Sequence, residues 1–116
     1  MKERSILGLT ETVKLLGNDQ KEEILLARID SGATSSSVDL NIAVKLQLGP
    51  ITRSKLVKSA SGVGKRPIVK AEVIIDGKNI EGEFTLVDRS HMTYPILIGQ
   101  NILKKGEFLI DPLKTS

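Results

Sequence analysis

Apolar and polar residues alternate over several short stretches of the chain, which is the pattern of half-buried β-strands. Residues 6–16 mix apolar and polar positions, residues 17–20 form a turn cluster, and residues 24–29 return to an apolar stretch. Gly8 and two nearby threonines favour a strand over a helix in the first stretch. These residues therefore predict a β-hairpin whose second strand ends at Asp30.

The second half of the chain carries further strand signals. Residues 51–58 look extended, and residues 68–75 and 80–87 flank Asp76-Gly77, a dipeptide that is typical of tight hairpin turns. These two stretches are therefore predicted to pair with each other. A closing strand is predicted over residues 108–110.

The segment 39–49 has an ambiguous pattern. Its apolar residues alternate strictly from Ile42 to Leu48, which favours a strand. Asp39 or Asn41 would instead suit the first turn of a short helix. We interpret the segment as a strand because of the alternation.

One helix is predicted near the C-terminus. Lys104-Lys105-Gly106 places two cations in a last helical turn next to a glycine, which is how short helices often finish. The remaining elements are short strands with turn signals at intervals of about ten residues. The pattern therefore predicts an all-β fold, a small barrel or sandwich. The length of 116 residues predicts one domain that spans residues 1–116.

Composition removes several function classes. The chain has no cysteine, so disulfides, thiolate zinc sites and a cysteine nucleophile are excluded. Aromatic residues make up 3%, which leaves few rings for the base-stacking platforms of single-strand nucleic-acid binders. The one histidine, His91, is expected to pair locally with Asp88 or the backbone rather than to bind a metal. No metal and no cofactor are therefore expected.

Nothing in the sequence predicts association with a membrane. No apolar run approaches the ~20 residues of a membrane span. Residues 1–4 lead into strand-like sequence without the apolar core of a signal peptide. We therefore expect a cytoplasmic protein.

The basic residues are unevenly distributed, although the net charge is only +3. Between Leu40 and Ala71 the sequence contains no acidic residue. Such a basic block either forms a solvated face or creates a field that attracts an anionic ligand. Its basic residues are Lys45, Arg53, Lys55, Lys58, Lys65, Arg66 and Lys70.

Asp30 stands where an apolar strand enters a turn. The preceding residues 24–26 favour burial, so the carboxylate occupies a costly position for a charge. Ser31 can bond to the backbone and Gly32 allows a close backbone approach, as a sharp turn requires. Asp30 is therefore either the capping residue of a strand-ending turn or a carboxylate held there for chemistry.

Asp30-Ser31-Gly32-Ala33 resembles the Asp-Thr/Ser-Gly-Ala/Ser loop of aspartic proteases. The chain carries this motif once, which is typical of retropepsin-like proteases, whose subunits each supply one catalytic Asp. Residues 96–99 and 101–103 resemble the second retropepsin signature, in which a hydrophobic run and a glycine pass behind the catalytic loop and lead into a helix. Gly62-Val63-Gly64 lies between the two motifs, where retropepsins carry a glycine-rich hairpin over the substrate. The resemblance implies a small closed retropepsin-like barrel with one short C-terminal helix.

The C-terminal third resembles one subgroup most closely. Residues 84–92, 94–99 and 108–112, together with residues 59–67, resemble the retropepsin-like family often labelled "ATP-dependent zinc protease". Some members accompany ATP-grasp glutamate ligases, and one trims oligoglutamate tails. The residues present support neither word of the label, because the chain has a single histidine and lacks the spacing of a phosphate-binding P-loop.

The resemblance implies an aspartic endopeptidase that is active as a homodimer, with Asp30, Ser31 and Gly32 as its catalytic residues. Asp30 would lie at the two-fold axis, the Ser31 hydroxyl would brace the loop of the other subunit, and Gly32 would offer backbone to the substrate. The basic block leads us to expect an acidic, Glu-rich peptide as the substrate. The expected substrate-binding residues are Ala33, Thr34, Lys58, Ser61, Gly62, Val63, Gly64, Lys65, Arg66 and Ile98.

One pair of positions departs from the retroviral members. They commonly carry an Asp shortly after the catalytic turn and an Arg after the second-motif glycine, and these two residues form an ion pair. Thr34 and Gln100 occupy the corresponding positions here, so we expect neutral hydrogen bonds in this region.

Two other functions fit parts of the sequence. A non-catalytic adaptor would keep the dimer and a peptide groove as the partner of an ATP-grasp ligase, with Asp30 retained for structure. A nucleic-acid binder would use the basic block, but the scarcity of aromatic residues and the lack of a recognised module argue against it. Substitution of Asp30 by Asn separates the enzyme from the adaptor, and a mobility-shift assay tests for nucleic-acid binding.

Overall fold

The computed structural model of the protein describes residues 3–59 and 62–115. Most of its elements are β-strands, and the two helices in this part of the chain are short. In chain order the elements are β1 (Ile6–Leu7), β2 (Thr10–Leu16), β3 (Glu22–Ile29), β4 (Ser36–Asp39), α1 (Leu40–Lys45), β5 (Ile51–Ser59), β6 (Gly62–Ile75), β7 (Lys78–Val87), β8 (Ile96–Ile98), α2 (Gln100–Gly106) and β9 (Leu109–Ile110).

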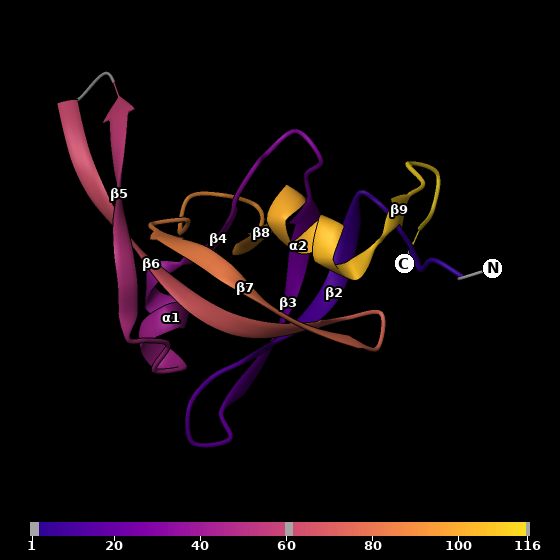
Figure 1. Cartoon of the computed structure of the whole chain (residues 1–116), viewed down its shortest axis with the longest axis horizontal. Helices are drawn as coiled ribbons and strands as arrows, with labels where there is room; N and C mark the ends of the chain where they lie inside the picture. The colour runs from indigo at the N-terminus through magenta and orange to yellow at the C-terminus, as the bar shows by residue number, and fades with distance from the viewer. Residues whose placement is uncertain (1–2, 60–61, 116) are drawn as a thin grey trace.

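Six strands close into a barrel in the order β2-β3-β8-β4-β7-β6, because β6 also pairs with β2. Strand β5 extends the sheet beyond β6, and the β5/β6 hairpin projects away from the barrel (Figure 1). Strands β1 and β9 form a separate parallel pair near the two ends of the chain. The predicted closed barrel is therefore confirmed.

Both predicted hairpins are present. Strands β2 and β3 pair in antiparallel register around the turn cluster, and β6 pairs with β7 across Asp76 and Gly77. These two turn residues have φ angles of 50° and 77°, the left-handed conformation that tight hairpin turns require. The predicted first strand is interrupted after Leu7, where β1 leaves the barrel to pair with β9.

The strand that we predicted within residues 39–49 is wrong, because the chain forms helix α1 there. Ala43 and Leu46, three residues apart, are buried, while Val44 is exposed. The apolar residues of this segment fit the repeat of a strand and that of a helix. The chain forms the helix because this conformation turns Ala43 and Leu46 toward the barrel core. The fold therefore has a second short helix in addition to the predicted α2. Neither helix in the described part of the chain has the length and hydrophobicity needed to cross a membrane.

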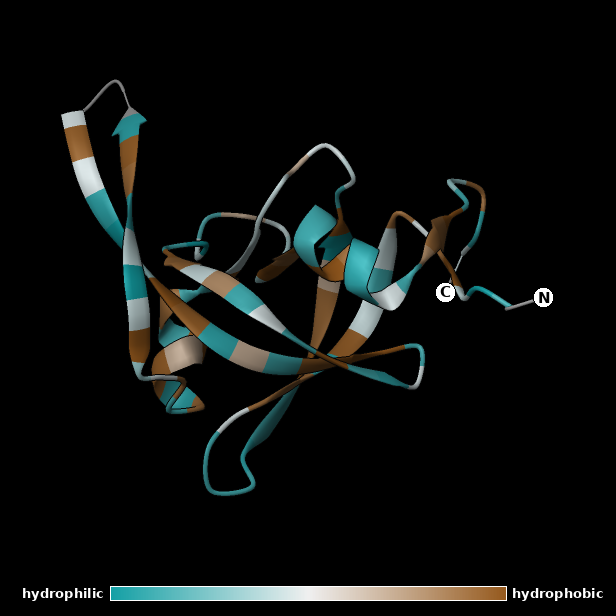
Figure 2. Cartoon of the chain, in the orientation of Figure 1, coloured by the Kyte–Doolittle hydropathy of each residue, from teal (hydrophilic) through white to brown (hydrophobic). Residues whose placement is uncertain are grey.

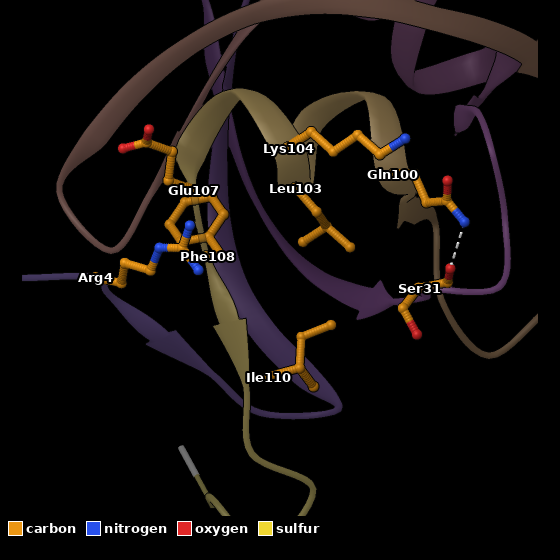
Figure 3. A pocket seen from close by; sticks show the side chains of 8 residues that line it. All are labelled: Arg4, Ser31, Gln100, Leu103, Lys104, Glu107, Phe108 and Ile110. Atoms are coloured by element: carbon orange, nitrogen blue, oxygen red, sulfur yellow. Dashed lines mark hydrogen bonds between the residues drawn. The ribbon is translucent and has the colours of Figure 1, made fainter.

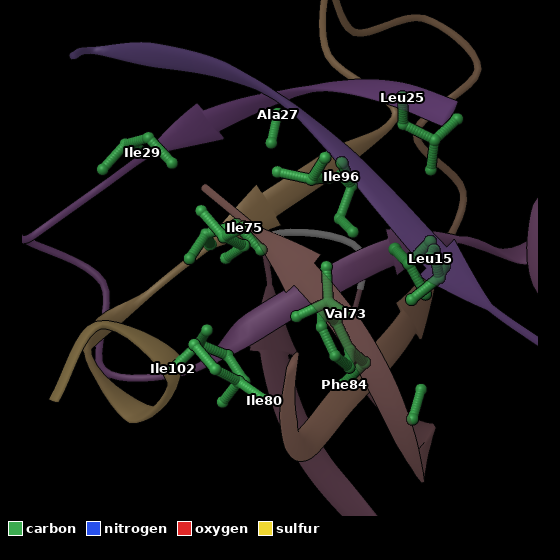
Figure 4. Packing of buried hydrophobic residues seen from close by; sticks show 14 of the residues in the cluster. Leu15, Leu25, Ala27, Ile29, Val73, Ile75, Ile80, Phe84, Ile96 and Ile102 are labelled. Atoms are coloured by element: carbon green, nitrogen blue, oxygen red, sulfur yellow. The ribbon is translucent and has the colours of Figure 1, made fainter. Parts of the chain in front are cut away.

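The core is built almost entirely from aliphatic side chains. Hydrophobic residues recur along the barrel strands (Figure 2), and buried positions alternate with more exposed ones along β2 and β3. The buried hydrophobic side chains meet inside the barrel (Figure 4). Phe84 is completely buried among them, and Ile96 and Ile98 of β8 are also completely buried. Strand β8 therefore lies within the barrel wall, between β3 and β4, and its position is set by both neighbours.

Gly99 lies where two backbone segments cross. A Cβ atom at this position would lie 2.2 Å from the carbonyl oxygen of Ser35 and 2.9 Å from that of Ala33. Immediately after the crossing, the amide of Gln100 donates a hydrogen bond of 2.8 Å to the Ala33 carbonyl. The glycine of the second motif therefore allows the close backbone approach that the sequence predicted.

We expect Gly99→Ala to lower the free energy of unfolding by about 3 kcal/mol or more, since the added methyl group would overlap backbone that cannot move aside cheaply. Urea denaturation followed by circular dichroism measures the loss. Gly64→Ala is the matched control, because no atom lies within 4 Å of a Cβ built at Gly64. The control should change the free energy by no more than about 1 kcal/mol. Equal stability of the two variants would contradict the close crossing.

Candidate active site

Asp30 lies directly after β3, at the same end of the barrel as the end of β8. Strands β3 and β8 are parallel neighbours with Ile29 opposite Ile98, and the amide of Asp30 donates a hydrogen bond of 2.9 Å to the Ile98 carbonyl. The side chain of Asp30 is 31% exposed, whereas Ile29 is buried. The carboxylate therefore lies at the surface but is anchored to the core through its own backbone.

The turn that follows orients the Asp30 carboxylate. The Gly32 amide donates a hydrogen bond of 3.0 Å to Asp30 Oδ1, and the Ala33 amide donates one of 3.3 Å to the Asp30 carbonyl. The second carboxylate oxygen, Oδ2, lies 4.0 Å from Nε of the exposed Arg28, a distance at which a surface ion pair contributes little. One oxygen is thus fixed by the backbone, and the side chain as a whole is partly exposed.

A buried polar network supports this turn from below. The Ser36 side chain, completely buried, accepts a hydrogen bond of 2.9 Å from the Gly99 amide and donates one of 2.7 Å to Asn101 Oδ1. Asn101 Nδ2 in turn donates to the Glu83 carbonyl of β7. The network joins β4, β7 and the start of α2. Sequence reasoning did not single out Ser36, because nothing in a run of three serines shows which hydroxyl is buried.

Gln100 is hydrogen-bonded to the loop that follows Asp30. This bond is neutral, as we expected from the lack of the Asp and Arg that form an ion pair in retroviral members. Gln100 Nε2 donates to the Ser31 carbonyl at 2.7 Å (Figure 3). The backbone carbonyl of Thr34, at the other corresponding position, accepts a bond from the Asn101 amide. A cavity of about 460 Å³ lies beside Ser31 and α2, and its lining residues are Arg4, Ser31, Gln100, Leu103, Lys104, Glu107, Phe108 and Ile110.

The glycine-rich segment of the basic block lies on the projecting β5/β6 hairpin. Gly62 and Gly64 belong to β6, opposite Ser59 and Val57, respectively. The hairpin has the place in the chain and the glycines of the substrate-covering hairpin that the resemblance implies. Ser61, one of the expected substrate-binding residues, lies outside the described residues.

A groove, called here the hairpin groove, lies between the base of this hairpin and the segment that follows Asp30. Its volume is about 210 Å³. Two exposed basic residues, Lys55 and Arg66, face each other across β5 and β6 and contribute to its wall. The full lining consists of Ser35, Ser36, Ser37, Lys55, Val57, Arg66, Thr85, Val87, Asp88, Arg89 and Met92.

The expected substrate-binding residues occupy three different settings. Arg66 lines the hairpin groove, whereas Lys58 and Lys65 occupy strand positions whose side chains alternate to the opposite face of the hairpin. Ala33 and Thr34 lie on the loop after Asp30. The side chain of Ile98 is completely buried beneath that loop, where its carbonyl supports Asp30.

Arg89 is a buried charged residue that sequence reasoning missed. It is 8% exposed, and it lines the hairpin groove. Its Nε donates to the Tyr94 carbonyl at 2.9 Å and its Nη1 to Ser37 Oγ at 3.1 Å, while its backbone amide donates to Asp39 Oδ1 at 2.8 Å. Burial lowers the pKa of the Arg89 guanidinium, and the nearby Asp39 carboxylate opposes that shift. No pattern in the sequence distinguishes this arginine from exposed ones.

Asp88 bonds to Ser90 rather than to the nearby His91. The Ser90 hydroxyl and the Ser90 amide both donate to Asp88 Oδ1, and these bonds lower the pKa of the Asp88 carboxyl, with a smaller contribution from His91. Within residues 3–59 and 62–115, no group of three or more His, Cys, Asp or Glu side chains is arranged to hold a metal ion.

The fold is similar to those of solved structures of low sequence identity. Protein Lpg0085, a protein of unknown function (DUF785) from Legionella pneumophila subsp. pneumophila str. Philadelphia 1, superposes with a TM-score of 0.68 and 22% identity over 97% of each chain. The solution structure of simian foamy virus (mac) protease gives a TM-score of 0.62 and 18% identity, over 82% of this chain and 91% of the protease. No curated protein matches the sequence. These similarities establish a retropepsin-like fold.

A family comparison extends the similarity beyond the fold. Residues 41–116 match the RimB-like family, described as "Retropepsin-like aspartic endopeptidase RimB". The matched region begins after the Asp30 turn and includes the projecting hairpin, β8, the crossing at Gly99 and α2. The match covers more than half of the chain, and the chain belongs to the RimB-like family of retropepsin-like aspartic endopeptidases.

Proposed function

We propose that this protein is an aspartic endopeptidase that works as a homodimer, with one retropepsin-like domain per subunit. The observation that carries the proposal is the setting of Asp30. Its carboxylate is exposed at one edge, is oriented by the Gly32 amide, and is fixed to β8 through its backbone. Preorganised carboxylates of this kind are suited to acid–base chemistry.

One carboxyl group per subunit supplies half of the required chemistry. Two carboxyl groups brought together at a two-fold axis share one proton. The ionised group takes a proton from water as the water oxygen bonds to the peptide carbonyl carbon, and the protonated group donates its proton to the carbonyl oxygen. Collapse of this intermediate breaks the C–N bond: one of its hydroxyl groups returns a proton to the ionised carboxylate as the carbonyl re-forms, and the leaving nitrogen takes the proton of the protonated carboxyl group. The pair thus ends with its one shared proton. The second Asp30 must therefore come from a second copy.

The residues around Asp30 are assigned roles on the same basis. The Ser31 hydroxyl braces the loop of the other subunit, and the Gly32 backbone binds the peptide. The hairpin that carries Gly62, Val63 and Gly64 closes over the peptide and excludes water. Ala33 and Thr34 contact the peptide from the loop.

Exposed apolar residues beside Asp30 support self-association. Ile6 and Leu109 are cross-strand neighbours in the β1/β9 pair, and both side chains are exposed. Leu9 is exposed as well, and its carbonyl accepts a hydrogen bond from the amide of Ile29, the residue before Asp30. Exposed apolar side chains of this kind fit the symmetric interface of a dimer.

The substrate in this proposal is an acidic, Glu-rich peptide tail. Arg53 is paired with Glu83, with 2.8 Å between Nη2 and Oε1. Lys58, Lys65 and Arg66 are exposed on the hairpin and take part in no ion pair among the described residues. Their positive field favours the approach of an anionic peptide. The resemblance to the ligase-associated subgroup adds an ATP-grasp glutamate ligase as a proposed partner.

The alternative proposal is a non-catalytic adaptor that binds peptides for such a ligase. The partial exposure of Asp30 and its placement at the molecular surface favour the enzyme, because a purely structural carboxylate would be expected to use both oxygens in internal bonds.

We expect Asp30→Asn to reduce peptide hydrolysis by about 10³-fold or more while the variant remains a folded dimer, since the amide cannot exchange the proton. Turnover of a fluorogenic Glu-rich peptide and sedimentation measure the two properties. Asp19→Asn is the matched control, because it removes the same charge from an exposed turn. Undiminished activity of Asp30→Asn would reject the enzyme and leave the adaptor.

We also expect kcat/KM for a Glu-rich peptide to fall about tenfold between roughly 50 mM and 500 mM NaCl, because salt screens the field of the exposed hairpin cations. The same peptide with Gln in place of every Glu serves as the control and should respond little. Hydrolysis of both peptides at equal rates at every salt concentration would remove the acidic-substrate assignment.

A further inference from the structure

The buried guanidinium of Arg89 has an incomplete set of partners. Two of its five N–H donors are used, by the Tyr94 carbonyl and by Ser37 Oγ. The residue is 8% exposed and lines the hairpin groove. A charge removed from water is costly unless an opposite charge or a full set of hydrogen bonds compensates it. The groove is thus where the missing acceptor would sit.

The neighbouring acids do not fill that role. Asp39 accepts from the backbone amide of Arg89, and Asp88 accepts from the amide and hydroxyl of Ser90. The ion pairs among the described residues do not include the Arg89 guanidinium. The Arg89 guanidinium therefore feels the Asp39 carboxylate at longer range, but no carboxylate contacts it directly.

The opposite wall of the groove adds two further cations. Lys55 and Arg66 are cross-strand neighbours, and both line the groove together with Val57. Neither forms an ion pair within the described residues. Three basic side chains therefore surround a volume of about 210 Å³ whose lining contains one acid, Asp88.

The groove is lined in part by residues that follow the proposed catalytic loop closely in the chain. Ser35 and Ser36, which line it, follow Asp30 by five and six residues, and the Ser35 carbonyl lies against Gly99. In the proposed complex, a side chain of a peptide bound over Asp30 enters this groove, whose volume suits one side chain rather than a larger ligand.

We propose that the hairpin groove is a carboxylate-binding subsite, in which Arg89 donates to a carboxylate of the bound peptide while Lys55 and Arg66 close over it from the hairpin. This inference rests on the proposed function and deepens it, because it assigns the preference for acidic peptides to named residues. The planar fork of Arg89, already oriented by Tyr94 and Ser37, matches the two oxygens of a carboxylate.

The test measures binding of two fluorescein-labelled, C-terminally amidated hexapeptides, hexaglutamate and hexaglutamine, to the Asp30→Asn protein by anisotropy. We expect hexaglutamate to bind at least about tenfold more tightly than hexaglutamine. Lys55→Gln combined with Arg66→Gln should remove most of this difference. The comparison variant, Lys58→Gln with Lys65→Gln, removes two charges from the opposite face of the same hairpin. Because these two lysines contribute to the long-range field and not to the groove, the variant should weaken hexaglutamate binding by less than about threefold.

Arg89→Lys tests the buried donor while keeping its charge. We expect it to lower the affinity for hexaglutamate by about tenfold without changing that for hexaglutamine, since lysine lacks the fork. Urea denaturation checks that the variant is folded. A third peptide, hexaglutamine with a free C-terminus, separates a terminal carboxylate from side-chain carboxylates. Tight binding of this peptide would identify the terminus as the group bound.

The inference is overturned if substitution of Lys58 and Lys65 lowers the affinity for hexaglutamate as much as substitution of Lys55 and Arg66 does. It is also overturned if the two amidated peptides bind the Asp30→Asn protein equally. The proposed function can fail separately. Hydrolysis of neutral peptides by the unsubstituted protein, with no preference for Glu, would leave the endopeptidase in place and reject the subsite. Groove-dependent binding of hexaglutamate without any hydrolysis by the unsubstituted protein would support the subsite and reject the endopeptidase.

Discussion

The structure of the candidate site depends on the backbone crossing at Gly99. The end of β8 and the loop after β3 approach so closely that the Ser35 carbonyl occupies the space of a side chain at this position. Hydrogen bonds join the two segments on either side of the crossing, from the Asp30 amide to β8 and from the first amide of α2 back to the loop. Because Asp30 belongs to one of these segments, the barrel wall sets the position of its carboxylate.

The same crossing lets a small aliphatic barrel hold the Asp30 carboxylate at its surface while the backbone polar groups beneath it stay hydrogen-bonded. Ser36 lies beneath the loop and satisfies the Gly99 amide, so the approach of two backbones leaves no buried donor unpaired there. Gln100 holds the loop through a neutral hydrogen bond to the Ser31 carbonyl. Rigid support from below and an exposed edge above are what a group that reacts with a bound peptide needs.

Local signals in the sequence predicted much of this arrangement. Asp76-Gly77 predicts a hairpin because the conformation of the turn depends on these two residues alone. The Asp30 turn and the backbone crossing at Gly99 were each predicted from a short motif. Helix α1 was missed because its apolar residues fit two periods, and only contact with the barrel decides between them. Strand pairing between distant segments buries Arg89 and Ser36 and turns Lys58 away from the groove. No local pattern in the sequence encodes such pairing.

The central claim is that two copies of Asp30 meet in the working molecule. Family membership and the barrel make this arrangement the natural completion of a chain that carries one such motif. A crystal structure of the assembled protein, together with its mass in solution, tests the claim directly. The account predicts a two-fold dimer in which the two Asp30 carboxyl groups lie about 3 Å apart. A monomer at high concentration, or a dimer that holds the two carboxyl groups far from each other, would contradict it.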